Sequence, residues 1–222
     1  MVRYLIGAFV ASLFCVFIST PALANSGELL NFQGLGDLQP VGNFYNGGGL
    51  TNTPNYGITF SSNFYGLRSV YNGGSGAFAS DPTGTPAIFV NGAAGSTVTG
   101  YMNVTNGFSG GIQFFYTAGF SETVTVWSGA NGTGTVLATI TLAPNNGSCS
   151  GFPTYCNWST AGLPFSGSAK SVTFTGTADG IGIADITVGS ASTAIPEPSA
   201  LYLLGTGLVG ISLGRVRRFI GI

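Results

Sequence analysis

The sequence lacks histidine and has very little charge. Its 222 residues include six Lys and Arg and seven Asp and Glu, so charged side chains make up 6% of the chain, against about 25% in a typical soluble domain. Without imidazole, the chain excludes Ser-His-Asp triads, Cys-His pairs and histidine-ligated zinc sites. A net charge of −1, with no basic cluster in the central part, also argues against nucleic-acid binding.

The N-terminal residues have the layout of a secretory signal peptide. Arg3 supplies a positive charge, an uncharged apolar run extends over 5–18, and alanines occupy positions 22 and 24. This layout predicts that signal peptidase cleaves between Ala24 and Asn25, so that residues 1–24 are removed on export. The alternative is an uncleaved membrane anchor, for which the apolar run is short.

The C-terminal residues combine a short motif, an apolar segment and a basic end. Pro196-Glu197-Pro198 is followed by an uncharged, Leu- and Gly-rich segment at about 199–214 and then by Arg215, Arg217 and Arg218. Arginines directly after an apolar segment hold that end of it in the cytoplasm. We therefore expect a transmembrane helix at about 199–214, with the preceding chain outside the cytoplasm.

These C-terminal features resemble the PEP-CTERM sorting domain of Gram-negative bacteria, a segment also labelled as an ice-binding protein C-terminal domain. The resemblance covers 195–222 and implies processing near Pro196-Glu197-Pro198 by an exosortase, a membrane cysteine peptidase. It also implies an exported chain that is anchored transiently in the inner membrane and then reaches the cell surface or extracellular matrix. The alternative is an ordinary membrane anchor with incidental prolines.

Residues 25–194 form one body domain with the sequence pattern of β-structure. Apolar and polar residues alternate, most clearly at 123–127 and 171–175, and Asn-Gly pairs of the kind that close hairpins separate many of the segments. We expect strands at 29–32, 58–60, 67–71, 87–90, 98–104, 112–116, 123–127, 136–142, 171–175 and 181–188. Expected Asn-Gly turns lie at 46–47, 72–73, 91–92, 106–107, 131–132 and 146–147. This pattern predicts an all-β fold, an antiparallel β-sandwich.

Cys149 and Cys156 are separated by seven positions in the body domain. In an exported protein, two cysteines this close are most simply explained by a disulfide that closes a surface loop. The alternative is a metal site, for which the body domain offers no further Cys or His ligand.

The last expected strand, 181–188, changes the parity of its apolar residues, which predicts a β-bulge near Ala184 and Asp185. The strand resembles the ending of jelly-roll domains in PEP-CTERM proteins and carbohydrate-binding modules. Residues 30–36 resemble their first strand, with Gln33 where an acid is usual. The resemblance implies a structural Ca²⁺ with Asp185 as a carboxylate ligand and Glu28, Asn31 or Gln33 as further oxygen donors. The alternative is a metal-free bulge residue; no other cofactor is expected.

No catalytic motif is present, so we expect a non-catalytic surface or matrix protein associated with exopolysaccharide. One alternative is an adhesin that resembles a carbohydrate-binding module, with Trp158 or Trp127 stacking on sugar rings. Another is a glycan-active enzyme that uses paired carboxylates. A third is ice binding through threonines such as Thr123 and Thr125. The expected partners are signal peptidase, exosortase and an extracellular polysaccharide.

Overall fold

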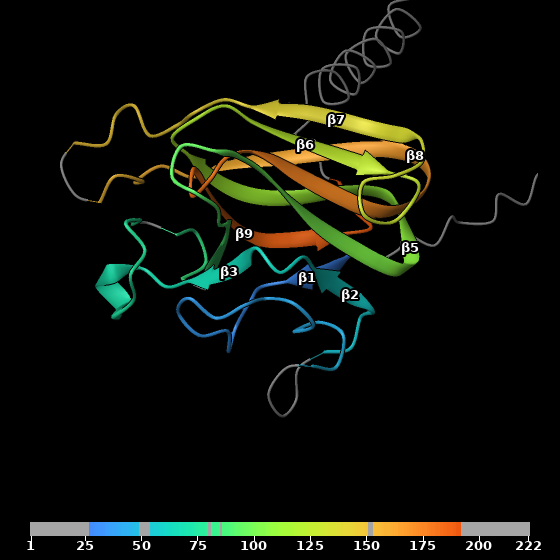
Figure 1. The fold of residues 1–222 in the computed structure, drawn as a ribbon, viewed down its shortest axis with the longest axis horizontal. Coiled ribbons are helices and arrows are strands. Elements are labelled where there is room, and N and C mark those ends of the chain that lie inside the picture. The colour runs from blue at the N-terminus through green and yellow to red at the C-terminus, as the bar shows by residue number, and fades with distance from the viewer. Residues whose placement is uncertain (1–26, 49–53, 80, 85, 151–152, 192–222) are drawn as a thin grey trace, which may run out of the picture.

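A computed structural model describes residues 27–48, 54–79, 81–84, 86–150 and 153–191. The strands are β1 (Glu28–Leu30), β2 (Ile58–Phe60), β3 (Phe64–Leu67), β4 (Ala87–Val90), β5 (Thr97–Ala118), β6 (Glu122–Trp127), β7 (Val136–Leu142), β8 (Ser159–Thr177) and β9 (Ile181–Val188). A 3₁₀ turn, η1 (Val70–Asn72), follows β3. All pairings between the named strands are antiparallel, and Figure 1 shows the arrangement. The predicted all-β, antiparallel class is confirmed.

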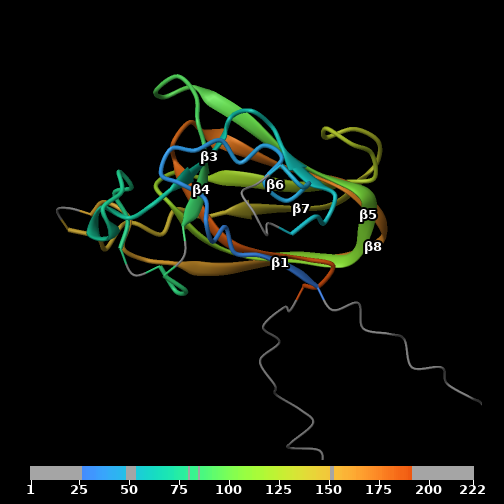
Figure 2. The same cartoon turned by 90° about the horizontal axis from the view of Figure 1, so that it is seen from below.

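One continuous sheet folds over itself to give the two layers of a sandwich. The first half of β5 pairs with β2 and with the second half of β8, which continues to β6 and β7. The second half of β5 pairs with the first half of β8 and with β9, which continues to β1, β4 and β3. Figure 2 shows β5 and β8 turning together at one side of the molecule.

The turn from one layer to the other falls at an irregular stretch of β5. The register between β5 and β8 shifts between Asn103 and Phe108 and again between Phe108 and Gly110. Gly107 and Gly110 have φ of +73° and +88°, which glycine adopts without steric cost. Bulges of this kind bend a strand and let a sheet close on itself.

The core lies between the two layers. Phe174 of β8 contacts Phe114 of β5 from the opposite layer, with ring centroids 5.6 Å apart, and Phe64 of β3 at 5.8 Å. Edge-to-face geometry of this kind adds to the free energy of apolar burial. The largest side chains that are almost fully buried are Tyr45, Phe32, Phe64, Phe114, Leu30, Ile58, Ile88, Met102, Ile112, Ile183, Ile186 and Val41.

Several strand boundaries differ from the prediction. Strand β1 ends at Leu30, because Phe32 adopts a φ of +55° that an extended strand does not allow. The segment predicted at 67–71 becomes the end of β3 followed by η1. The predicted strands 98–104 and 112–116 are parts of the single strand β5. The expected turn at 106–107 was therefore wrong, since these residues form a bulge within β5.

The two expected terminal segments lie outside the described residues. These are the signal peptide, with Ala24 and Asn25 at its cleavage site, and the transmembrane helix at about 199–214. Within the part of the chain that the structure describes, no helix has the length and apolar character needed to cross a membrane.

Candidate functional site

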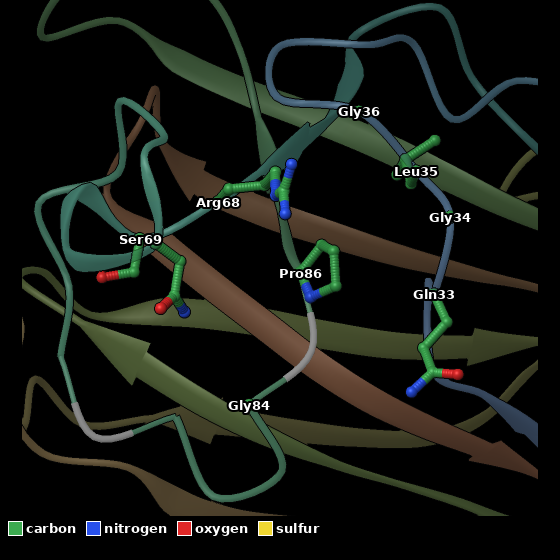
Figure 3. A pocket seen from close by; sticks show the side chains of 9 residues that line it. Gln33, Gly34, Leu35, Gly36, Arg68, Ser69, Gly84 and Pro86 are labelled. Carbon is green, nitrogen blue, oxygen red and sulfur yellow. The ribbon is translucent and has the colours of Figure 1, made fainter.

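A polar groove is lined by three segments that are far apart in the sequence. Residues 33–36 follow β1, Arg68, Ser69 and Asn72 follow β3, and Gly84 and Pro86 precede β4. The groove encloses about 750 Å³. Figure 3 shows the side chains of Arg68 and Pro86 between the 33–36 segment and Ser69. Gln33, Arg68 and Asn72 are exposed, so their amide and guanidinium groups are accessible to a ligand.

Asp37, next to the 33–36 segment, is hydrogen-bonded to the segment that contains Arg68. Its carboxylate accepts a hydrogen bond from the Arg68 backbone N–H at 2.8 Å and another from the Ser75 hydroxyl at 2.8 Å. Burial raises the pKa of Asp37, but these hydrogen bonds and the positive charge of Arg68 outweigh burial and lower it below its usual value. Asp37 is therefore ionised at neutral pH and holds the two groove walls together.

The turn η1 carries an exposed aromatic side chain, Tyr71. The Ser69 hydroxyl oxygen accepts a hydrogen bond from the Tyr71 N–H at 3.3 Å, and the hydroxyl donates to the Phe78 carbonyl at 2.6 Å. This cap fixes the short turn on the body of the protein. Tyr71 is 65% exposed and directly precedes the groove residue Asn72 in the chain.

The two tryptophans considered from the sequence have structural contacts. Trp158 is half-buried, its indole N–H donates to the Ala79 carbonyl at 2.9 Å, and its ring packs edge-on against Phe78. Trp127 is also half-buried and donates its indole N–H to the Thr173 hydroxyl at 3.0 Å. Neither tryptophan is among the residues that line the groove.

Asp185 lies in a bulge of β9. The register between β5 and β9 shifts from Gln113 opposite Thr187 to Phe115 opposite Ala184, so β9 contains one extra residue there. Asp185 has a φ of +47° and is 7% exposed. The predicted position of the bulge agrees with this geometry.

A second pocket, of about 390 Å³, adjoins this bulge. It is lined by Leu29, Asn31, Gln33, Thr83, Gln113, Phe115, Asp185 and Thr187. The structure thus brings together Asp185, Asn31 and Gln33, three of the residues considered from the sequence as calcium ligands. The fourth, Glu28, is exposed in β1 and is not among the lining residues of this pocket.

Asp81 is a second carboxylate near Asp185. Its Oδ1 accepts hydrogen bonds from the backbone N–H and the hydroxyl of Thr83, at 3.1 and 3.2 Å. Burial raises the pKa of Asp81, and the negative charge of Asp185 raises it further, against the opposing effect of the Thr83 hydrogen bonds. In the described part of the chain, no group of three or more His, Cys, Asp and Glu side chains has the geometry of a metal site.

The structure links Cys149 and Cys156 by a disulfide, with a Cα–Cα distance of 5.7 Å. The Cys156 N–H donates to the Cys149 sulfur at 2.9 Å. These contacts close a loop between β7 and β8, as the spacing of the two cysteines predicts.

Comparison with known families identifies the C-terminal segment. The model of the PEP-CTERM protein-sorting motif matches residues 194–218. The chain carries this sorting motif. The match includes Pro196, Glu197, Pro198, Arg215, Arg217 and Arg218, all of which lie outside the described residues. A PEP-CTERM motif implies an exported protein that is sorted to the cell surface.

Among solved structures, the chain is similar to two carbohydrate-binding modules. For a module of family 29, the identity is 15% and the TM-score 0.36, and the match covers 50% of this chain and 74% of the module. For a module of family 6, the values are 16% and 0.37, with 75% and 95% covered. At these values the likeness is distant. No curated protein matches this chain in sequence.

The sequence did not indicate the groove residues Arg68 and Asn72, or the neighbouring Tyr71 and Asp81. One signal was available, because Arg68 is one of only two basic residues between positions 25 and 194, the other being Lys170. The walls of the groove come from three distant segments, so their proximity follows from the tertiary structure alone.

Proposed function

We propose that the protein is an exported, exosortase-processed surface or matrix protein whose body domain binds an extracellular polysaccharide in the polar groove. Signal peptidase removes residues 1–24, and exosortase then processes the chain near Pro196-Glu197-Pro198. The sorting motif at 194–218 supports export and sorting. The mature body is displayed at the cell surface of a Gram-negative bacterium or in its exopolysaccharide matrix.

The observation that carries the binding proposal is the groove itself. Its volume of about 750 Å³ lies within the range of ligand pockets, roughly 300–1,000 Å³. The guanidinium of Arg68 and the amides of Gln33 and Asn72 offer planar hydrogen-bonding groups, which suit the closely spaced hydroxyl groups of a sugar. Arg68 can also pair with the carboxylate of an acidic sugar. Tyr71, exposed next to Asn72, offers a face for a sugar ring.

The binding proposal is tested with an array of neutral and uronic-acid-containing oligosaccharides. We expect wild type to bind a subset of the array and Arg68→Ala and Tyr71→Ala to lose at least tenfold in affinity. The matched controls are Lys170→Ala and Phe120→Ala, which remove an exposed base and an exposed aromatic ring outside the groove. Equal binding by all four variants, or no binding by wild type, would contradict the proposal.

Trp158→Phe separates the groove from the other binding candidate. The substitution keeps an aromatic ring against Phe78 and removes the indole N–H that Ala79 accepts. We expect it to lower stability and leave glycan affinity unchanged. If Trp158→Phe abolishes binding in folded protein while Arg68→Ala does not, the glycan site lies at Trp158.

The sorting proposal is tested in the host organism. Mass spectrometry of the mature protein should find Asn25 as the first residue and a C-terminus close to Pro196-Glu197-Pro198. Deletion of the exosortase gene should leave the chain unprocessed at its C-terminus and retained in the membrane. A mature chain that ends at Ile222 in a strain with active exosortase would show that the segment acts only as an anchor.

A further inference from the structure

Two buried carboxylate oxygens have no hydrogen-bond partner within the part of the chain that the structure describes. They are Oδ2 of Asp81 and Oδ2 of Asp185. A buried carboxylate oxygen normally accepts hydrogen bonds or binds a cation, because its loss of hydration is otherwise uncompensated. The charge of Asp185 acts on Asp81, so a single cation can compensate both oxygens.

The backbone around Asp185 directs its carboxylate into the second pocket. Asp185 is only 7% exposed, and it adopts a left-handed φ of +47° at the bulge of β9. Such a conformation is uncommon outside glycine and tends to persist where the side chain has a specific task. Asp185 lines the pocket together with side chains that also carry oxygen: Asn31, Gln33, Thr83, Gln113 and Thr187. A set of carboxylate, amide and hydroxyl oxygens suits a hard divalent cation such as Ca²⁺.

Asp81 reaches the same region from the loop before β4. The two Thr83 hydrogen bonds occupy its Oδ1, and the Gly84 N–H donates to its backbone carbonyl at 3.3 Å. Within the described residues, Oδ2 of Asp81 takes part in no hydrogen bond. Thr83, two residues on, lines the Asp185 pocket. The negative charges of Asp81 and Asp185 repel each other, and a cation bound by both would offset that repulsion.

The same loop forms a wall of the polar groove. Gly84 and Pro86 line the groove, Thr83 lines the Asp185 pocket, and Gln33 lines both. Whatever fixes the loop at Asp81 therefore also fixes one side of the groove.

We propose that Asp81 and Asp185 jointly bind one divalent cation, of which Ca²⁺ fits best, and that this cation fixes the loop segment 81–84, which contributes to a wall of the groove. Asp81 supplies the ligand from the loop, and Asp185 supplies the ligand from the sheet. Polysaccharide binding in the groove then depends on the cation. Cation binding by Asp81 and Asp185 is independent of the proposed function, whereas the dependence of polysaccharide binding on the cation rests on it.

The cation site is tested by thermal unfolding and titration calorimetry with CaCl₂ alone. We expect Ca²⁺ to raise the melting temperature of wild type in a saturable manner, relative to EDTA and to NaCl at equal ionic strength. Calorimetry should give one site per chain. Asp81→Asn and Asp185→Asn should lose both responses, whereas the control Asp179→Asn, on an exposed side chain outside both pockets, should keep them.

The melting temperatures of the variants in EDTA show whether misfolding explains a lost Ca²⁺ response. Each Asn substitution removes one of two negative charges that repel each other, so both variants should melt in EDTA at or above the melting temperature of wild type. Asparagine also tolerates the left-handed conformation at position 185. Absence of a Ca²⁺ response in wild type, or a full response in both variants, would overturn the proposal.

The dependence of the groove on the cation is tested with the oligosaccharide array in CaCl₂ and in EDTA. We expect wild type to lose at least tenfold in affinity in EDTA, and Asp81→Asn to bind weakly in both. If Ca²⁺ binds but wild type binds no glycan in either buffer, the proposed function fails and the cation site stands. Equal glycan affinity in CaCl₂ and EDTA, with Ca²⁺ bound in the first, would overturn the dependence.

Discussion

Glu122 should make the stability of the protein fall as the pH rises towards neutrality. Its side chain is 3% exposed, and one carboxylate oxygen accepts a hydrogen bond from the Thr177 N–H at 3.2 Å. Burial raises the pKa of Glu122 from 4.5 to about 7, against the opposing effect of that hydrogen bond. Between these two pH values the folded chain holds the proton more tightly than the unfolded chain does.

The sign of the effect follows from proton linkage. Because the folded state binds more protons, the free energy of unfolding decreases as the pH rises from 4.5 to about 7. Below this window the contribution of Glu122 is fully present, and above it the contribution is lost. A pKa difference of this size corresponds to about 3 kcal/mol. Glu122→Gln removes the ionisation and keeps a carbonyl oxygen for the Thr177 N–H, so the variant should gain up to this amount over wild type between pH 4 and pH 8.

The measurement is urea unfolding of wild type and Glu122→Gln from pH 4 to pH 9. The difference between the two free energies of unfolding isolates Glu122, because pH effects from other carboxyl groups, such as Asp179, are common to both proteins. The buried amide adds an offset that does not vary with pH. Glu28→Gln, on an exposed residue, is the matched control and should follow wild type throughout. A wild-type-to-variant difference that is the same at pH 4 and pH 8 would refute the reasoning.

Three further predictions concern the packing of the fold. Replacement of Cys149 and Cys156 by Ser should lower the free energy of unfolding by about 2.5 kcal/mol through the entropy of the opened loop, measured by urea unfolding against the oxidised, disulfide-bonded wild type. Phe174→Ala should cost about 4 kcal/mol, because the ring contacts both Phe64 and Phe114, and Phe174→Leu should cost clearly less. Gly176→Ala should cost on the order of 2 kcal/mol, since an added Cβ would displace the buried carboxylate of Glu122, which accepts a hydrogen bond from the Thr177 N–H; an unchanged melting temperature would contradict this.

Strands with strong local patterns could be predicted, whereas strands that depend on their partners could not. The boundaries of β7 and β9 agree with the alternation of branched apolar residues along them. The first half of β8 contains Gly162, Pro164 and Gly167, residues with low strand propensity. That half is extended because β5 pairs with it residue by residue, with Pro164 opposite Gly111. Such pairing is a non-local property that no window of sequence contains.

The same limit explains the Asn-Gly pairs. Asn131-Gly132 has φ of +53° and +68° and lies in the hairpin loop between β6 and β7, as predicted. Asn106-Gly107 has an identical local signal and a φ of +73° at Gly107, yet it forms a bulge in a continuous strand. Both structures need a residue with positive φ. What distinguishes them is whether the flanking segments pair with each other or with a third strand.

The candidate site also has one part that the sequence could predict and another that depends on tertiary structure. The bulge at Asp185 could be predicted because a change in apolar parity is visible along one strand. Its relation to Asp81 could not, because the two residues are more than a hundred positions apart and meet only when the loop before β4 folds onto the first and last strands. Arg68 carries no motif, and its place in the groove depends on the 33–36 segment that lines the groove with it.

The distribution of the few charges strengthens the case that the acidic residues have specific roles. In the body domain, the basic residues Arg68 and Lys170 are exposed, as solubility requires. Four of its acidic residues differ, since Asp185 and Glu122 are buried and Asp37 and Asp81 are half-buried. Burial of a carboxylate is costly, and a chain that covers its surface with Thr, Ser and Asn does not need buried acids for solubility. We therefore expect Asp81 and Asp185 to affect cation binding, and Glu122 to affect pH dependence, far more than they affect solubility, and the asparagine and glutamine variants separate these effects.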